Sequence, residues 1–291
     1  MTGPASTATG RAIAAVCFGI FCLATLDAAA KWLVAEHSVA QIVFLRMAVT
    51  APAAVVLAWT MGGLHLLKPQ RVGMHLLRGV FGTCSATFFF AALRYLPLAT
   101  VWTIAFSAPL IMTALSRPFL GEPVGARRWV AVLAGFAGVL VVVQPGASGI
   151  SSLGLTYAIL GTLAYSLLQL TARKYAASET TPAMVLFNAL VPVVLAGAAM
   201  PVLWTTPTAG GWLAFAVLGV FSAGAVTFLT LGYRLAPPAV VAPFDYTALV
   251  WSVLWGWVIW RDWPEPATWA GAAIIVASGL YIIRREARGG V

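Results

Sequence analysis

"LRYLPLATVWTIAFSAPLIMTALSRPFLGEPVGARRW" (93–129) returns in looser form as "YRLAPPAVVAPFDYTALVWSVLWGWVIWRDWPEPATW" (233–269). At a shift of 140 residues, Arg94, Pro97, Ala99, Val101 and Trp129 fall on Arg234, Pro237, Ala239, Val241 and Trp269, and Glu122 falls on Asp262. At a shift of 143, Lys31, Glu36 and Phe44 fall on Lys174, Glu179 and Phe187. Because the matches keep their order, we interpret 1–146 and 147–291 as two copies of one unit.

The composition indicates that the chain is built for lipid. Hydrophobic residues make up 61% of its 291 residues and charged residues only 9%, whereas soluble domains carry about 25% charged residues. Segments of about 20 apolar residues span a bilayer, and in lipid each must close its own backbone hydrogen bonds as a helix. We therefore predict an all-α polytopic membrane protein with ten transmembrane helices. They cover about 12–34, 39–61, 72–93, 98–116, 127–144, 152–173, 182–203, 211–232, 239–260 and 267–283.

The net charge of +9 is distributed as an orientation signal. Of the 17 Lys and Arg residues, thirteen fall on the side that carries both termini. Lys31, Arg94 and Arg261 fall on the other side, and Arg46 lies within a span. This bias predicts cytoplasmic N- and C-termini and argues against nucleic acid as a partner.

Five spans per half is an odd number, so the second copy must cross the membrane in the opposite sense. Inverted repeats of this kind are typical of secondary transporters, in which two similar halves surround a site near the bilayer midplane. The sequence thus predicts two inverted five-helix repeats around a central cavity, with alternating access as the mechanism.

Several segments together resemble a known superfamily. They are the turn "RYLPLA", the span with Pro109, the turn "RPFLGEPVGARRW" and the Gly-rich span "VAVLAGFAGVLVV". The chain resembles the drug/metabolite transporter superfamily, and within it the ten-helix exporters built from two EamA-type repeats. This implies a bacterial inner-membrane protein that exports small organic solutes, aromatic or other amphiphilic amino acids and related metabolites among them. The chain departs from the pattern at Leu249, where the family usually has proline, and at Asp262, where it has glutamate.

Charged residues inside the predicted spans are the first candidates for the site, because each is costly in lipid. Asp27 and Arg46 lie at similar depth on neighbouring antiparallel spans. They form either a buried structural charge pair or a wall that recognises a zwitterion. Asp245 has no cation one turn away in its own span, so it must face the cavity or a partner. There it can attract a substrate amine or couple a proton to transport.

Aromatic and amide side chains form a second set, since rings bind flat or cationic solutes. The predicted substrate-binding residues are Trp102, Phe106, Tyr165, Gln169, Asn188, Asp245 and Tyr246. Prolines inside spans remove backbone hydrogen bonds and are either static kinks or hinges for gating. The hinge candidates are Pro52, Pro109, Pro192 and Pro243.

Other functions find less support. An integral-membrane enzyme acting on a lipid-soluble substrate is the alternative, but His37, His65 and His75 lack a neighbouring nucleophile or carboxylate pair in the sequence. A channel would need a polar ring or a filter-like loop. Cys17, Cys22 and Cys84 lack metal-ligand spacing, so neither a metal nor a cofactor is expected. The small-residue faces of spans 5 and 10 fit an internal seam or a dimer contact, which leaves monomer and homodimer open.

Overall fold

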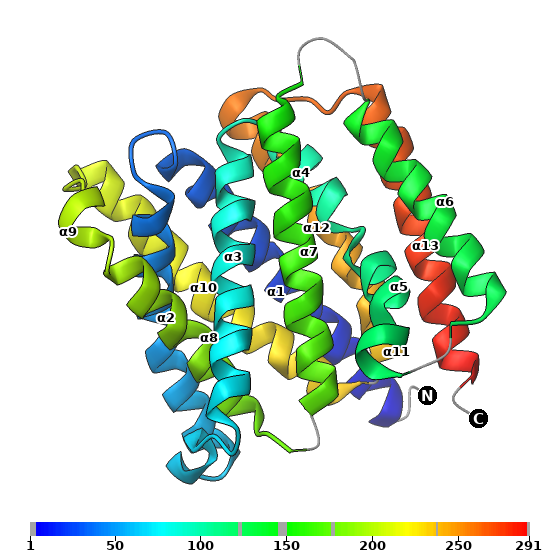
Figure 1. Ribbon diagram of the computed structural model, residues 1–291, viewed down its shortest axis with the longest axis horizontal. Coiled ribbons are helices and arrows are strands. Elements are labelled where there is room, and N and C mark those ends of the chain that lie inside the picture. The colour runs from blue at the N-terminus through cyan, green and yellow to red at the C-terminus, as the bar shows by residue number, and fades with distance from the viewer. Residues whose placement is uncertain (1–3, 122–123, 145–149, 176–177, 237, 290–291) are drawn as a thin grey trace.

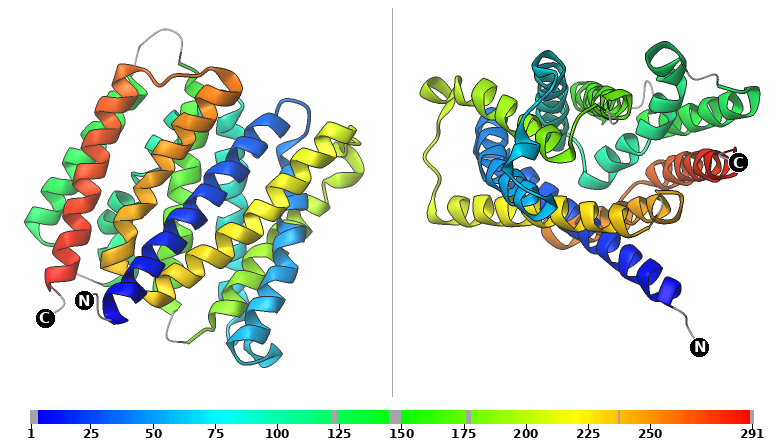
Figure 2. Two further views of the ribbon diagram at one scale, coloured as in Figure 1. Left: turned by 180° about the vertical axis from the view of Figure 1, so that it is seen from behind. Right: turned by 90° about the horizontal axis from the view of Figure 1, so that it is seen from below.

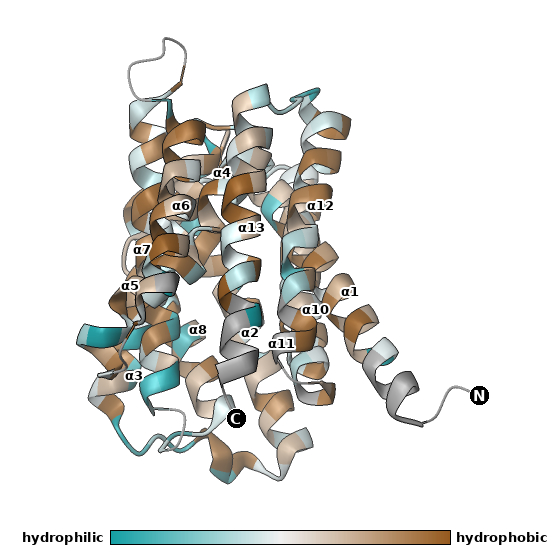
Figure 3. Cartoon of the chain, turned by 90° about the vertical axis from the view of Figure 1, so that its right-hand side faces the viewer, coloured by the Kyte–Doolittle hydropathy of each residue, from teal (hydrophilic) through white to brown (hydrophobic). Residues whose placement is uncertain are grey.

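The computed structural model describes residues 4–121, 124–144, 150–175, 178–236 and 238–289, and its regular elements there are all helical (Figure 1). The proposed boundary between the halves, at 146/147, lies outside the described residues. Apolar residues line the helices along most of their length, and the hydrophilic ones concentrate toward their ends (Figure 3). This distribution fits helices that satisfy their backbone internally and present apolar side chains to lipid.

The described residues of the first half form six α-helices and one short 3₁₀ helix. They are α1 (Pro4–Leu33), α2 (Val39–Met61), η1 (Leu64–Leu67), α3 (Val72–Leu93), α4 (Leu98–Ala105), α5 (Ala108–Leu120) and α6 (Ala126–Val143). The second half holds α7 (Ser152–Tyr175), α8 (Thr181–Gly197), α9 (Met200–Leu203), α10 (Ala209–Leu235), α11 (Pro238–Val241), η2 (Ala242–Tyr246), α12 (Thr247–Trp255), η3 (Gly256–Trp260) and α13 (Pro266–Gly289).

Among the described residues, six helical segments are long and apolar enough to cross a membrane. They are Gly10–Leu33, Val39–Met61, Val72–Leu93, Leu98–Leu120, Ser152–Tyr175 and Ala209–Tyr233, and shorter apolar helices cover Arg128–Val143, Thr181–Gly197 and Pro266–Ile282. The chain is therefore a multi-pass helical protein, in which α1 begins and α13 ends at the same end of the bundle (Figures 1 and 2). We call this the terminal end and the other the distal end.

Two predicted spans are interrupted rather than continuous. The span 98–116 is divided into α4 and α5 at Phe106 and Ser107, and it continues to Leu120. The span 239–260 is divided into α11, η2, α12 and η3. Pro109 and Pro243 lie at these two breaks, where a residue without a backbone N–H removes a helical hydrogen bond. A third predicted span, 182–203, ends early because α8 stops at Gly197 and α9 follows separately.

The closest helix packing joins one half of the chain to the other. The most extensive pairs are α1 with α10, α3 with α7, α6 with α13 and α2 with α8. The repeat matches α1 to α7, α3 to α10, α2 to α8 and α6 to α13. It therefore turns the α1–α10 pair into the α7–α3 pair, and it maps the α2–α8 and α6–α13 pairs onto themselves. This is the contact pattern of two interleaved repeats related by a two-fold axis. Gly271 allows the close crossing of α6 and α13, because a Cβ there would lie 2.3 Å from Val142.

Candidate functional site

The two interrupted spans meet at a ring contact in the interior. The rings of Phe106 and Tyr246 have centroids 5.1 Å apart and an angle of 65° between their planes. Phe106 falls on Tyr246 at the shift of 140 that relates the two halves. A contact between residues that the repeat makes equivalent is expected at the two-fold axis, so this pair marks the centre of the bundle.

A row of aromatic rings extends from this contact toward α3. Trp102 lies 5.7 Å from Phe106, and Phe89 lies 5.9 Å from Trp102, between ring centroids. The indole Nε1 of Trp102 is buried without a hydrogen-bond partner among the described residues. The row thus offers apolar faces together with a polar atom that a ligand can satisfy.

Asp245 lies beside Tyr246 in η2 and is only half satisfied. Its Oδ2 accepts a 2.6 Å hydrogen bond from the hydroxyl of Tyr233 on α10. Its Oδ1 and the Tyr246 hydroxyl are both buried without a partner in the described part of the chain. An unpaired buried acceptor is unfavourable, so Oδ1 is suited to a ligand that brings an N–H group or a positive charge.

Tyr165 and Gln169 are accessible residues on a mostly buried face of α7. Both lie on the face of α7 that is turned toward α3, where Gly161 packs on the backbone of Phe89. The residues of this face nearer the distal end are buried: Ala158, Gly161 and Thr162. Tyr165, in contrast, keeps 44% of its surface accessible, and Gln169 is also exposed. Tyr165 is close enough to Asp245 to interact with it electrostatically.

Asp27 and Arg46 are near each other without a direct ion pair. They interact electrostatically, but the ion pairs of the described residues do not include them. Arg46 donates from Nε to Ser222 Oγ at 3.4 Å, and its Cζ lies 5.3 Å from the ring centre of Phe90. The Trp102 indole N–H approaches Asp27, although its geometry falls short of a hydrogen bond. This charged pair therefore adjoins the aromatic row at Trp102.

The remaining candidates occupy different places. Asn188 on α8 points at α3, where its Oδ1 would lie 2.1 Å from a Cβ on Gly82, and that oxygen has no partner among the described residues. Pro52 and Pro192 lie within the uninterrupted helices α2 and α8. Only two of the four hinge candidates, Pro109 and Pro243, thus coincide with a break.

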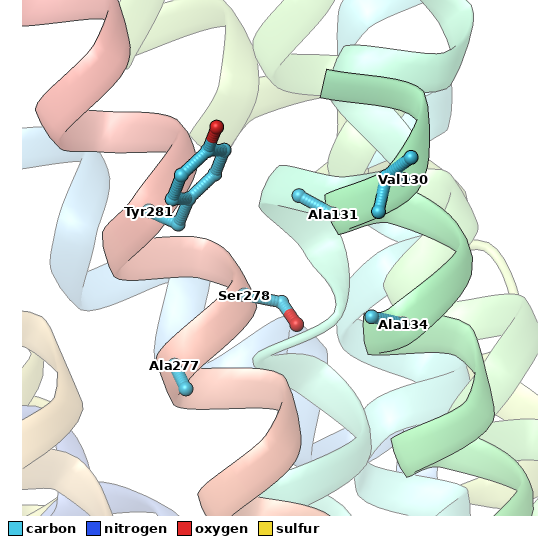
Figure 4. A pocket seen from close by; sticks show the side chains of 6 residues that line it. All are labelled: Val130, Ala131, Ala134, Ala277, Ser278 and Tyr281. Atoms are coloured by element: carbon cyan, nitrogen blue, oxygen red, sulfur yellow. The ribbon is translucent and has the colours of Figure 1, made fainter. Parts of the chain in front are cut away.

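A groove of about 460 Å³ lies on the outside of the bundle, apart from these residues. Figure 4 shows its lining, which comes only from α6 and α13: Val130, Ala131, Ala134, Ala277, Ser278 and Tyr281. The groove is apolar and contains none of the candidate residues, so we assign it to lipid contact rather than to the site. Among the described residues there is also no His, Cys, Asp and Glu cluster arranged for a metal ion.

Polar contacts that the sequence did not suggest close the distal end. Lys31 Nζ lies 3.0 Å from Asp262 Oδ2 and donates to the carbonyl of Leu96 at 3.2 Å. Trp255 donates to Thr25 Oγ1 at 3.1 Å. The Gln41 amide exchanges two hydrogen bonds with the backbone of Thr205, at 2.8 and 3.0 Å. Apart from the bond to Leu96, each contact joins one half of the chain to the other, and side-chain types alone gave no signal for the pairing.

A second tie, at the terminal end, is built on Glu179. Its carboxylate accepts hydrogen bonds from the backbone N–H groups of Gln70 and Arg71, at 3.1 and 2.7 Å, and lies 3.0 Å from His75 Nε2. The Glu179 side chain has no accessible surface because its immediate neighbours cover it. It nevertheless lies at the edge of the bundle, with little protein beyond those neighbours. Burial alone would raise the pKa of Glu179, but the hydrogen bonds to His75 and the backbone outweigh it, so the pKa lies below its ordinary value.

Comparison with known proteins agrees with this architecture. The chain is 32% identical over 235 residues to a riboflavin transporter of Vibrio cholerae, covering 79% of this chain and 77% of that one. It is 30% identical over 228 residues to an S-adenosylmethionine uptake transporter of Rickettsia bellii, covering 77% of both chains. It is 26% identical over 270 residues to a pseudopaline exporter of Pseudomonas aeruginosa, covering 91% and 93%.

A solved crystal structure has the same fold, with a TM-score of 0.63 and 22% identity over 96% of this chain and 98% of the other. The sequence pattern of the EamA-like transporter family matches residues 10–144 and again 152–284. The chain is a membrane transporter that belongs to the EamA-like transporter family, with one copy of the family's unit in each half.

Proposed function

We propose that this transporter moves small amphiphilic solutes with a flat ring and an N–H or cationic group, aromatic amino acids and related metabolites foremost, out of the cell. One observation carries the proposal: Asp245 presents an unpaired oxygen beside a row of rings where the two interrupted spans meet. The ring faces provide flat apolar surface, and each ring contact contributes about 0.5–1.5 kcal/mol beyond burial.

Transport by alternating access fits the two ends of the bundle. Lys31, Trp255 and Gln41 tie the distal end, while Tyr165 and Gln169, farther along α7, stay accessible. The tied contacts are short polar pairs in a bundle with little other charge, so a second state can form when they separate. Pro109 and Pro243 lie at the breaks where the helices can bend.

The names of the relatives support a substrate with a flat ring, but they do not agree on the direction of transport. Riboflavin and S-adenosylmethionine both carry fused aromatic rings, and the names of the relatives include both uptake and export. We retain export as our prediction for this chain. Asp245 also provides a group that can take up a proton, so we propose proton coupling at this position.

We propose ten crossings with both termini in the cytoplasm, because the charge bias and the shared end of α1 and α13 agree. A cysteine at Thr206, in the turn between α9 and α10, is expected to react with an impermeant reagent in intact cells. A cysteine at Arg284 near the end of α13 is expected to be protected. The reverse pattern would overturn the orientation.

Reconstituted protein tests the proposed function. Proteoliposomes are loaded with labelled tryptophan, leucine, riboflavin or S-adenosylmethionine, and efflux is followed with and without a pH gradient. The proposal predicts efflux of at least one flat solute, inhibition by the others, and little leucine movement. Efflux of leucine at the same rate as every flat solute would contradict it.

A further inference from the structure

We infer that Asp27 and Arg46 form a receptor for the zwitterionic head group of an α-amino acid, whose flat side chain lies along the aromatic row toward Asp245. This inference rests on the proposed function and deepens it, because it selects amino acids among flat amphiphiles. It assigns the carboxylate to Arg46 and the ammonium group to Asp27.

Arg46 has an unused anion-binding fork. Its Nε is directed at Ser222 Oγ at 3.4 Å, which is long for a hydrogen bond. Among the described residues no hydrogen bond or ion pair engages its two terminal nitrogens, and they are not enclosed. A guanidinium offers two parallel N–H groups that match a carboxylate. The guanidinium lies beside Ser222 of α10 and Phe90 of α3, and its terminal nitrogens are suited to an anion that arrives there.

Asp27 is not the anion that the Arg46 guanidinium binds. Its electrostatic coupling to Arg46 shows that the two charges are close, yet they make no direct ion pair. A purely structural pair would be expected to close to hydrogen-bond contact, because each buried charge otherwise loses solvation without return. Two separated opposite charges are complementary to a zwitterion, in which a carboxylate and an ammonium group are attached to the same carbon atom.

The aromatic row gives the head group an orientation. Within the row Trp102 approaches Asp27, and Tyr246, next to Asp245 in the chain, lies at the end. A solute bound by its head group at Asp27 and Arg46 can therefore place a flat side chain against Trp102 and Phe106. The unpaired Oδ1 of Asp245 is the acceptor that we assign to an N–H group of that side chain. Tryptophan has each of these features.

The test is equilibrium binding of three probes to the purified full-length chain in lipid nanodiscs: L-tryptophan, its methyl ester and tryptamine. The ester and tryptamine keep the ring and the ammonium group but lack the carboxylate. We expect tryptophan to bind at least about tenfold more tightly than either, since hydrogen bonds between charged groups are strong.

The variant that isolates the receptor is Asp27→Asn with Arg46→Gln, which removes both charges together and leaves neither unpaired. In this double variant tryptophan and its ester are expected to bind equally, while tryptamine loses only its contact with Asp27. Arg94→Gln, which removes an exposed cation at the distal end, is the matched control and should keep the wild-type preference.

The outcomes separate the inference from the function on which it rests. Equal binding of tryptophan and its ester to the wild type, or an unchanged preference in the double variant, would overturn the head-group receptor and leave an aromatic site. Failure of all three probes to bind the wild type would overturn this inference, whereas the proposed function would be overturned separately, if none of the flat solutes leaves the proteoliposomes.

Discussion

The two halves of the chain share a backbone plan but differ in the polar groups that they place on it. At the shift of 140, Phe106 matches Tyr246, and the two rings touch, but Ala105 occupies the position that Asp245 has in the second half. The first half instead contributes Trp102, matched by Ala242. The repeat thus places the two rings at equivalent positions, whereas the polar groups of the proposed site, Asp245 and Trp102, have no polar counterpart in the other half.

Other matched pairs show the same contrast at the ends of the bundle. Glu179 is enclosed and bonded by His75 and two backbone N–H groups, whereas its counterpart Glu36 is exposed. Lys31 is paired with Asp262, whereas its counterpart Lys174 is exposed. Each pair thus provides a position held by polar contacts and an exposed counterpart in the other half that serves as a control.

The largest effect is expected for Asp245→Asn, which removes the carboxylate that the second interrupted span has and the first, with Ala105 at the matching position, lacks. The amide keeps the size and can still accept from Tyr233, so the protein should remain folded. Transport should fall about tenfold or more through loss of the charged acceptor, and its dependence on a pH gradient should weaken. Efflux from proteoliposomes and thermal unfolding measure the two properties.

Glu265→Gln, an exposed acid of the same half, is the matched control and should transport normally. Wild-type efflux from Asp245→Asn at every pH would remove Asp245 from the site. Collapse of the folded protein would assign it a structural role instead.

Gly279→Ala should disturb the ring pair from outside the site. A Cβ at Gly279 would lie 1.9 Å from the Tyr246 hydroxyl, so the ring must move. A shift of about 1 Å in a binding group can cost well over tenfold in function, and we expect about a tenfold loss of transport with normal expression. Gly73→Ala, with nothing within 4 Å of its Cβ, should have no effect. Equal activity of the two variants would show that Tyr246 does not need its position.

Glu179→Gln should lower stability, and Glu36→Gln should not. The pKa of Glu179 is lowered in the folded protein from its ordinary value of 4.5. The charged carboxylate therefore stabilises the fold fully above pH 4.5, and this stabilisation is lost as the pH falls through the pKa of the folded protein. We expect a loss of about 1 kcal/mol at pH 7, reduced by nearby solvent. The difference in unfolding temperature from wild type should shrink below pH 4.5. A difference that stays constant down to pH 3 would exclude the carboxylate as its source.

The smallest effect is expected for Lys31→Gln, since its ion pair with the partly exposed Asp262 is at the edge of the bundle, and ion pairs near the surface contribute about 0–1 kcal/mol. Loss of the contact with Asp262 should favour opening at the distal end. A cysteine placed at Trp260, over which Lys31 lies, should react with an impermeant reagent up to about fivefold faster. Lys174→Gln is the control in the other half, and faster labelling in that variant as well would argue against a specific tie.

Helix type and repeat could be predicted from the sequence because both depend on local patterns. Apolar segments must be helical in lipid, and Pro109 and Pro243 indicated where two of them weaken. The partner of Asp245 could not be predicted, because Tyr233 lies on another helix and its proximity depends on how α10 packs. The same applies to Ser222 beside Arg46 and to the ties at Lys31 and Glu179. Such contacts arise because helices of one half pack against helices of the other, and the alignment of the two repeats does not show which helices pack together.

The ratio of tryptophan to leucine efflux tests most directly whether both interrupted spans contribute to one aromatic site. It should be measured in proteoliposomes with the wild type, Phe106→Leu and Tyr246→Leu, which keep apolar volume but remove the rings. We predict that the ratio falls about twofold to tenfold in each variant, while leucine efflux and unfolding temperature change little. An unchanged ratio in both variants, or equal losses for both amino acids, would contradict a site at the meeting of the two halves.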